Sequence, residues 1–357
     1  MRSHPARTQK REENKMEQTN RQPQELTLAV VGATGLVGRE MLTVLEAHGF
    51  GSCRVVAAAS SRSVGHRVPF AGRELTVVST EEAIAAHPQY ALFSAGASVS
   101  RTLAPQFAAT GCTVIDNSSA WRKEADIPLV VPEVNLDVVR DSDRIIANPN
   151  CSTIQMVLAL APLQRRYGIR RIVVSTYQSI TGTGKKAVDQ LEYEEQHPSA
   201  TEAHPMAYPY AIHRNLFPHG GDFLPSGYTT EEQKLVDETH KILRDETIGV
   251  SATVARVPVV GGHSESVNVE LRSDYDLAEV VQLLNEMPGL VVQDDPSQNL
   301  YPMPITAHHR DEVFVGRLRR DPSCPQALNL WIVADNLRKG AATNAVQIME
   351  QLMRRRS

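Results

Sequence analysis

Cysteine is scarce in this chain of 357 residues, which has only four. They lie far apart and form no CxxC pair: Cys53, Cys112, Cys151 and Cys324. Because no apolar leader precedes the first predicted strand either, we expect no disulfide framework. The expected location is a reducing cytoplasm.

Metal-ligand spacings are also missing. Twelve histidines are present, but none belongs to an HExxH or similar pattern. His308 and His309 are adjacent, and in a strand they would point to opposite faces. We therefore predict no metal site.

Long apolar runs and an excess of one charge are absent as well. The longest strongly apolar stretch, residues 156–163, is far shorter than the ~20 residues that span a bilayer. Thirty-seven basic and 41 acidic residues give a net charge of −4, which argues against nucleic acid or an anionic membrane as a partner. The apolar content of 41% is that of a globular protein, and the length favours about two domains.

The first half of the chain alternates apolar runs with helical patterns. Residues 1–24 are polar and predict a disordered tail, with a targeting peptide or a true start at Met16 as alternatives. Residues 25–148 predict an α/β domain of the Rossmann type, a parallel sheet with helices on both faces. The expected strands are 26–31, 54–59, 90–95 and 112–116, and the expected helices are 36–45 and 99–109.

The second half, residues 149–335, predicts another α/β domain with a mixed sheet. The expected helices are 152–166 and 230–244, and the expected strands are 171–177, 250–257, 266–271 and 327–334, with a polar stretch at 197–219. A last helix at 341–353, within segment 336–357, is expected to return to the first domain.

A glycine-rich turn follows the first predicted strand. Gly32, Gly35 and Gly38 form a G-x-x-G-x-x-G pattern between that strand and the next helix. There, glycines permit a tight turn and close backbone approach, and the helix N-terminus attracts a pyrophosphate. The pattern predicts dinucleotide binding; the alternative is an ordinary strand-to-helix turn.

The end of the second predicted strand favours NADP over NAD. NAD sites usually carry an acidic residue there for the ribose 2′-hydroxyl, but no Asp or Glu occurs between Glu46 and Glu74. Ser60, Arg62 and Ser63 stand there instead and suit a 2′-phosphate. A solvated polar turn is the alternative.

Cys151 lies in the sequence NPNCST, directly before a helical apolar pattern. Pro149 blocks an earlier helix start, and the Asn, Ser and Thr side chains are expected to cap it. At a helix N-terminus the dipole lowers a thiol pKa, so Cys151 is predicted to be a nucleophile. The alternative is a small buried apolar residue.

A third motif, RVPVVGGHSES, joins two predicted strands. Arg256 ends one strand and can contact a carboxylate or phosphate, while His263 in the loop can act as general acid or base. A lone solvated histidine is the alternative. An NADP site, a thiol and a histidine together predict carbonyl chemistry through a thiohemiacetal and a thioester.

From about Leu26 onward the chain resembles the bacterial aspartate-β-semialdehyde dehydrogenase family. Seven motifs in the family's order carry the resemblance: GATGLVG, NSSAWR with VPEVN, NPNCST, TYQSITGTGKKA, EEQK, RVPVVGGHS and DNLRKGAATNAVQ. It implies a Rossmann domain and a catalytic, dimer-forming domain. It also implies NADPH-dependent reduction of L-aspartyl-4-phosphate to L-aspartate 4-semialdehyde and phosphate, in the biosynthesis of lysine, threonine, methionine and isoleucine (the diaminopimelate pathway), by a homodimer.

The resemblance assigns roles to individual residues. Cys151 matches the nucleophile, His263 the acid or base and Gln178 a residue that orients the substrate. Substrate contacts match Arg256 for the α-carboxylate, Glu231 for the amino group, Arg122 and Lys234 for the phosphate, and Asn150 beside the cysteine. NADP contacts match Gly32, Thr34, Gly35, Leu36, Val37, Ser60, Arg62, Ser63, Gly182 and Asn336.

Three other readings remain open. N-acetyl-γ-glutamyl-phosphate reductase shares the thiol chemistry, but its substrate lacks the amino group that Glu231 would meet. Glyceraldehyde-3-phosphate dehydrogenase is more distant, and the missing NAD-type acid counts against it. A catalytically silent binding protein would not need Cys151, Gln178, Arg256 and His263 together.

Overall fold

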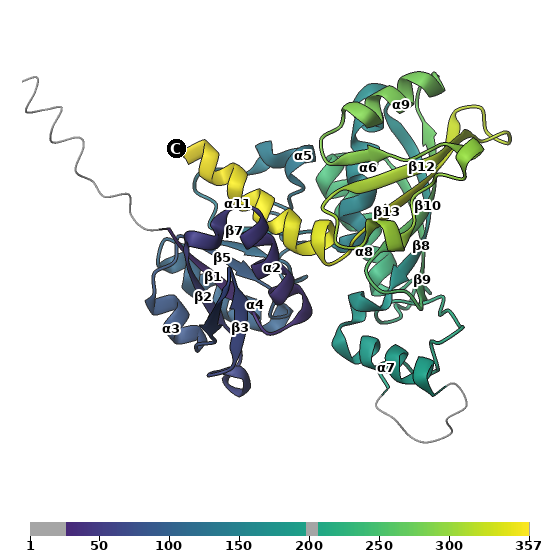
Figure 1. Ribbon diagram of the computed structural model, residues 1–357. Helices are drawn as coiled ribbons and strands as arrows, with labels where there is room; N and C mark the ends of the chain where they lie inside the picture. The colour runs from purple at the N-terminus through teal and green to yellow at the C-terminus, as the bar shows by residue number, and fades with distance from the viewer. Residues whose placement is uncertain (1–25, 198–205, 357) are drawn as a thin grey trace, which may run out of the picture.

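The computed structural model describes residues 26–197 and 206–356, which build two α/β units on separate sheets (Figure 1). The predicted tail, residues 1–24, and part of the polar stretch 197–219 lie outside the described residues. Within the described ranges, no helix is long and apolar enough to cross a membrane.

The first sheet is parallel throughout, in the order β2-β1-β5-β6-β7. Its central strands are buried on both faces, which explains their continuous apolar sequences TLAVV and YALF. The strands are β1 (Thr27–Val31), β2 (Arg54–Ala58), β5 (Tyr90–Phe93), β6 (Thr113–Asp116) and β7 (Ile145–Ala147).

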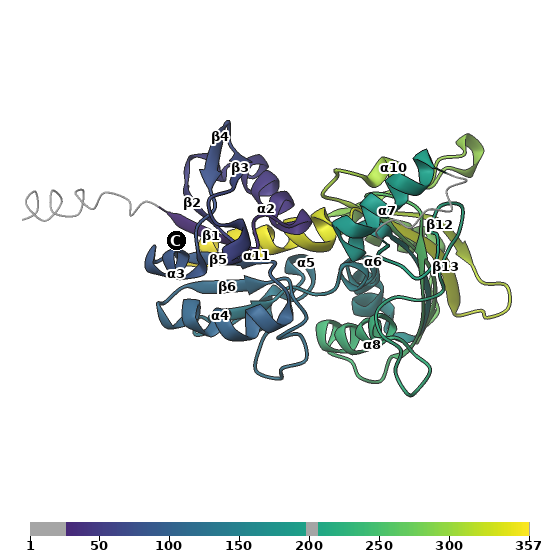
Figure 2. The same cartoon turned by 90° about the horizontal axis from the view of Figure 1, so that it is seen from below.

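Helices cover both faces of this sheet, as predicted. Met41 and Leu45 of α2 pack on Leu28 and Val30, while Phe107 of α4 belongs to the core on the other face. Figure 2 shows α2 and α4 on opposite sides of the strands. The helices here are α2 (Leu36–Ala47), α3 (Thr80–Ala85), α4 (Ala97–Ala109) and α5 (Pro132–Asn135), with short helices η1 (Phe50–Ser52), η2 (Ser61–Ser63) and η3 (Leu136–Val138).

The second sheet is mixed, in the order β11-β12-β13-β10-β8-β9. The two outer pairs, β8 with β9 and β11 with β12, are parallel, and the other pairs are antiparallel. The strands are β8 (Ile169–Ser179), β9 (Gly249–Val257), β10 (His263–Leu271), β11 (Leu290–Val292), β12 (Val313–Arg320) and β13 (Ala327–Ala334).

One face of the second sheet is covered by helices. The central helix α6 is buried almost along its whole length, and α8 and α9 join the same core. The helices are α6 (Cys151–Tyr167), α7 (Lys185–Gln196), α8 (Thr230–Leu243), α9 (Leu277–Glu286) and α10 (Pro304–Ala307), with η4 (Ile180–Thr183) and η5 (Pro296–Gln298). On the opposite face Tyr177 and Trp331 contact each other, their ring centres 5.5 Å apart.

The C-terminal segment connects the two units. A π-helix, η6 (Arg338–Ala342), leads from the second sheet into α11 (Thr343–Arg356). Val346 and Met349 of α11 then pack in the core beside α2 and the first sheet. The chain therefore crosses back, and Figure 1 shows α11 bridging the gap between the units.

Several elements were not predicted, and one boundary matters for the site. The hairpin β3 (Arg67–Phe70) and β4 (Arg73–Thr76) carries a proline and charged residues, which obscure a strand pattern. β7, β11, β12, α3, α7 and α9 were also missed. The strand predicted from residue 266 begins at His263, so this histidine belongs to a strand and not to the preceding loop.

Candidate active site

Cys151 is the first residue of α6, so the predicted helix start is correct to one residue. The predicted side-chain cap is wrong, however: Asn150 occupies the N-cap position but makes no cap hydrogen bond. Its Nδ2 instead donates to Glu231 Oε1 at 2.7 Å and to Ser152 Oγ at 2.8 Å. Because no side chain at the N-cap occupies the first backbone N–H groups of α6, they remain available to a ligand.

The sulfur of Cys151 lies 3.1 Å from Nε2 of His263. The backbone N–H of Ser179 donates to the other ring nitrogen, Nδ1, at 3.0 Å. A neutral imidazole that accepts at Nδ1 carries its proton on Nε2, which therefore points at the sulfur. The cysteine thiol can donate in turn toward Asn150 Oδ1, 3.9 Å away.

Both partners are neutral in this geometry. Burial raises the pKa of the Cys151 thiol to about 12 and Glu231 adds to the rise, while Arg256 opposes it. Burial, and then Arg256, lowers the pKa of His263 to about 3. The expectation of a thiolate is therefore wrong for the resting site, because burial outweighs the helix dipole. The proton must leave the sulfur during the reaction.

Glu231 lies at the start of α8 and is ionised. Burial opposes ionisation, but Lys234 and Asn150 together lower its pKa to about 2. Lys234 Nζ donates to Glu231 Oε2 at 2.8 Å. One buried carboxylate thus joins α8 to the residue before Cys151.

Arg256 and Gln178 are the last residues but one of the parallel neighbours β9 and β8, where their Cα atoms are paired in register. Arg256 is 7% exposed, and its Nη1 donates to the Ser179 carbonyl at 2.7 Å. Gln178 is 1% exposed, and its Nε2 has no partner among the described residues. This amide N–H is free to donate a hydrogen bond to a substrate oxygen.

Gly182 brings the η4 loop against Arg256 and His263. A Cβ at this position would lie 2.8 Å from Arg256 Nη1 and 3.4 Å from the His263 ring. Asn336, also predicted as a cofactor contact, accepts a hydrogen bond from Thr181 Oγ1 at 2.9 Å. The loop is therefore held between the two units, next to the cysteine and the histidine.

Three further residues of the site were not predicted. Glu238 accepts hydrogen bonds from Arg122 and from the backbone N–H of Asn150. Ser179 contacts His263 through its backbone, and Gly340 of η6 packs so closely that a Cβ there would lie 2.8 Å from that of Cys151. Gly340 falls within the DNLRKGAATNAVQ motif, which could have indicated it.

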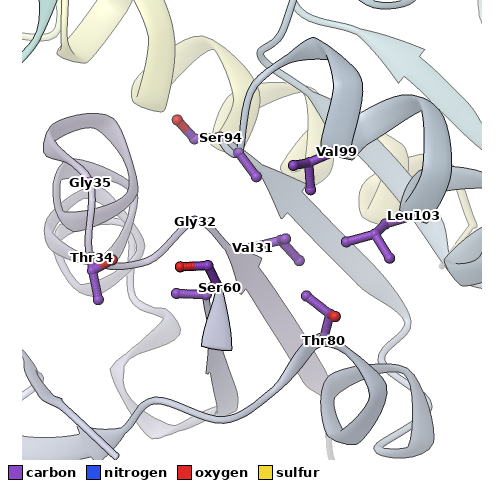
Figure 3. A pocket seen from close by; sticks show the side chains of 11 residues that line it. Val31, Gly32, Thr34, Gly35, Ser60, Thr80, Ser94, Val99 and Leu103 are labelled. Carbon is purple, nitrogen blue, oxygen red and sulfur yellow. The ribbon is translucent and has the colours of Figure 1, made fainter. Parts of the chain in front are cut away.

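The glycine turn after β1 forms the floor of a cavity of about 390 Å³. Gly32 has φ +90°, and a Cβ there would lie 2.3 Å from the Ser94 carbonyl oxygen, so only glycine fits. Figure 3 shows Thr34 and Ser60 on one side of this cavity and Val99 and Leu103 of α4 on the other. An apolar wall opposite small hydroxyl groups suits an adenosine.

A second cavity of about 410 Å³ shares Thr34, Gly35 and Ser94 with the first. It lies at the N-terminus of α2, where the N-cap Gly35 has no side-chain cap. Lys185 and Arg39 also line it, together with Leu36, Val37, Thr181, Gly182, Thr183 and Gly184. Free N–H groups, a helix dipole and two cations suit a pyrophosphate. The residues present therefore fit a dinucleotide extended from the first cavity toward Gly182.

The predicted 2′-phosphate residues lie on the short helix η2 and just before it. Arg62 is exposed, and Ser63 Oγ lies 3.5 Å from Thr34 Oγ1. The structure thus brings Ser63 beside the glycine turn, with Arg62 facing solvent next to it.

His308 and His309 follow α10 and do not lie in a strand; their rings stack, with centres 3.7 Å apart. Nδ1 of His308 and the ligand atoms of His309 and Asp335 lie within 4.8 Å of one another. Asp335, however, already accepts hydrogen bonds from the backbone N–H groups of Leu337 and His309 and from the ring Nδ1 of His308. This carboxylate shapes the turn before η6.

Known proteins match both units. A family model described as the NAD-binding domain of semialdehyde dehydrogenase matches residues 27–142, and one described as the dimerisation domain matches residues 160–339. An aspartate-semialdehyde dehydrogenase of Aquifex aeolicus is 50% identical over 332 residues, covering 92% of this chain and 98% of the relative. The chain belongs to the aspartate-semialdehyde dehydrogenase family.

Further family members agree in sequence and structure. The enzyme of Bacillus subtilis is 46% identical over 336 residues, covering 92% of this chain and 97% of its own. The crystal structure of aspartate semialdehyde dehydrogenase II from Vibrio cholerae, complexed with ASA, has a TM-score of 0.88 at 43% identity and covers 93% of this chain and 99% of that one. The predicted fold class is confirmed: a nicotinamide-dinucleotide domain of the Rossmann type and a mixed-sheet dimerisation domain.

Proposed function

We propose that the chain catalyses the NADPH-dependent reduction of L-aspartyl-4-phosphate to L-aspartate 4-semialdehyde and phosphate. The observation that carries the proposal is the 3.1 Å contact between the Cys151 sulfur and the protonated nitrogen of His263, beside buried cations. A hydride-only dehydrogenase would need no thiol.

Substrate charges match the side chains around this contact. Arg256 is the proposed partner of the α-carboxylate and Glu231 that of the amino group. Arg122 and Lys234 are the proposed partners of the acyl phosphate, with Asn150 between Glu231 and the cysteine. Gln178, with its free Nε2, is proposed to hold the acyl oxygen.

The thiol chemistry proceeds in two stages. The sulfur of Cys151 attacks the acyl carbon; a C–S bond forms, the bond from carbon to the phosphate oxygen breaks, and the thiol proton leaves with the phosphate. Bound NADPH would supply the hydride that converts the thioester to a thiohemiacetal. The C–S bond then breaks, the proton of the thiohemiacetal hydroxyl passes to the sulfur and the aldehyde leaves; the Nε2–H of His263 is placed to donate a hydrogen bond to the sulfur while it carries negative charge.

Cofactor choice is part of the proposal. Gly32, Thr34, Gly35, Leu36 and Val37 are proposed to hold the dinucleotide along the two cavities, with Gly182 and Asn336 at the nicotinamide end. Ser60, Arg62 and Ser63 are proposed to bind the 2′-phosphate, which gives NADP preference.

The remaining proposals concern assembly and setting. We propose a homodimer formed by the second unit, in the cytoplasm, supplying the aldehyde for lysine, threonine, methionine and isoleucine biosynthesis. The face of the second sheet opposite α6, partly covered by α10 and with Tyr177 exposed, suits contact with a second copy.

The test is the reverse reaction. With L-aspartate semialdehyde, we expect NADP reduction that requires phosphate and is weak with NAD. Activity only with N-acetyl-glutamate semialdehyde would replace the proposal with the reductase alternative and remove the role of Glu231. A folded, NADPH-binding protein inactive with both aldehydes would be a silent relative.

A further inference from the structure

Glu238 joins two parts of the site that are far apart in the sequence. Its Oε1 accepts from Arg122 Nη1 at 3.1 Å, and its Oε2 accepts from the backbone N–H of Asn150 at 2.6 Å. The side chain is 3% exposed. One buried carboxylate therefore contacts both a cation proposed for the phosphate and the residue that precedes the nucleophile.

The position of Glu238 on α8 makes this possible. Glu231, Lys234, Glu238 and Lys241 follow one another at spacings of three and four residues, which gives one helix face. Lys241 Nζ on this face donates to the Arg122 carbonyl at 2.9 Å. The face therefore holds the Arg122 segment at both its backbone and its guanidinium group.

Two nitrogens of the Arg122 guanidinium group are hydrogen-bonded, and the third has no partner among the described residues. Its Nη1 donates to Glu238, and its Nη2 donates to the Asn117 carbonyl at 2.8 Å. Its Nε is buried, and among the described residues it has no partner. Arg122 is only 7% exposed, so leaving its Nε–H unpaired costs free energy unless a ligand accepts a hydrogen bond from it.

We propose that Glu238 is a positioning residue that fixes the Arg122 guanidinium for the departing phosphate and, through the same carboxylate, fixes the backbone that carries Cys151. The Arg122 half of this proposal rests on the proposed function. The Asn150 half concerns only the cysteine and does not depend on the substrate.

Two variants separate position from charge. E238D keeps the negative charge but withdraws it by one methylene, and E238Q keeps the length but turns an amide donor toward Arg122. Both are expected to raise the KM for phosphate in the reverse reaction about tenfold or more, the usual effect of losing a charge-assisted hydrogen bond. If Glu238 only neutralised the charge of Arg122, the phosphate KM would be normal in E238D and lowered in E238Q. That result would overturn the proposal.

A double-mutant cycle tests whether Glu238 acts through Arg122. In an R122Q background, E238Q is expected to change the phosphate KM no further. Fully additive effects would contradict the coupling. D237N is the matched control, because Asp237 is the neighbouring acid on α8 and contacts Lys123 and Gln233 instead; its phosphate KM is expected to be normal.

Alkylation of Cys151 tests the second contact without any substrate. Burial raises the thiol pKa, so freeing the Asn150 backbone in E238D is expected to speed labelling by iodoacetamide about fivefold or more while kcat falls. Buried Cys112 must stay unlabelled, which excludes general unfolding. Unchanged labelling would contradict the Asn150 half. A wild-type enzyme without phosphate dependence would overturn the proposed function, yet this labelling result would still stand.

Discussion

The cofactor groove and the proposed catalytic cluster around Cys151 are built by different means. The groove, made of the two adjoining cavities, is formed by a glycine turn, a helix N-terminus and small hydroxyl side chains of the first unit, with residues 181–185 of the second unit on one side. The cluster is formed by charged and polar side chains from distant segments, most of them hydrogen-bonded to one another. The groove therefore depends on backbone shape, and the cluster depends on mutual contacts between side chains.

Removal of the proposed nucleophile, Cys151, gives the largest expected difference between the two regions. C151A is expected to lower kcat by about 10⁴-fold or more, because no other group can form the thioester. NADPH affinity should stay within about twofold of wild type, as measured by fluorescence titration. Normal turnover in C151A would rule out covalent catalysis.

A methyl group added to one glycine in each region should separate binding from chemistry. In G340A the new Cβ would lie 2.8 Å from that of Cys151, so kcat is expected to fall about 10- to 100-fold with NADPH affinity retained. In G32A it would lie 2.3 Å from a main-chain oxygen at φ +90°, so NADPH binding is expected to be lost and the melting temperature lowered. Lost NADPH binding in G340A and a lowered kcat with normal NADPH binding in G32A would refute the separation of the two regions.

Arg62 tests whether a side chain also matters in the groove. R62A is expected to raise the KM for NADP about tenfold and to leave the KM for NAD nearly unchanged, because only NADP carries the 2′-phosphate. Steady-state kinetics with both cofactors measure this. An equal rise for both would show that Arg62 does not read the 2′-phosphate.

His48 lies outside both regions, at the end of α2 between Asp311 and Glu350, and gives the smallest expected effect. The Asp311 carboxylate, 3.8 Å from Nε2, and then Glu350, hydrogen-bonded to Nδ1 at 3.0 Å, raise its pKa from 6.5 to about 9. Since the folded pKa is the higher one, the stabilisation is complete below pH 6.5 and is lost as the pH rises toward 9. Because His48 is partly exposed, solvent screens its ion pairs. H48Q should therefore lower the free energy of unfolding by about 1–2 kcal/mol at pH 6 and by close to nothing at pH 9.5. Denaturant unfolding at both pH values checks this, and a pH-independent difference would contradict it.

The groove was predictable because its signals are local in the sequence. The strand, the turn at Gly32 and helix α2 follow one another, and the parallel sheet follows from the alternation of elements. Helix α6 was predicted to within one residue at each end, because Pro149 and the apolar pattern define it.

The cluster around Cys151 was predictable only in part. Position in the sequence indicated Cys151, Arg256 and His263, but no pattern shows that His263 begins a strand or that Glu238 reaches Asn150. The pKa of Cys151 was predicted with the wrong sign, because burial and the charge of Glu231 arise only in the folded chain. Contacts between segments 88 and 112 residues apart have no local signature.

The most direct test of covalent catalysis is to trap the acyl group on the sulfur of Cys151. The protein would be mixed with L-aspartate semialdehyde and NADP in the absence of phosphate, and its peptides analysed by mass spectrometry. We expect a burst of about one NADPH per site and an aspartyl group on Cys151, because nothing is present to release the thioester quickly. Phosphate-dependent turnover of the aldehyde without any acyl group on Cys151 would contradict the account.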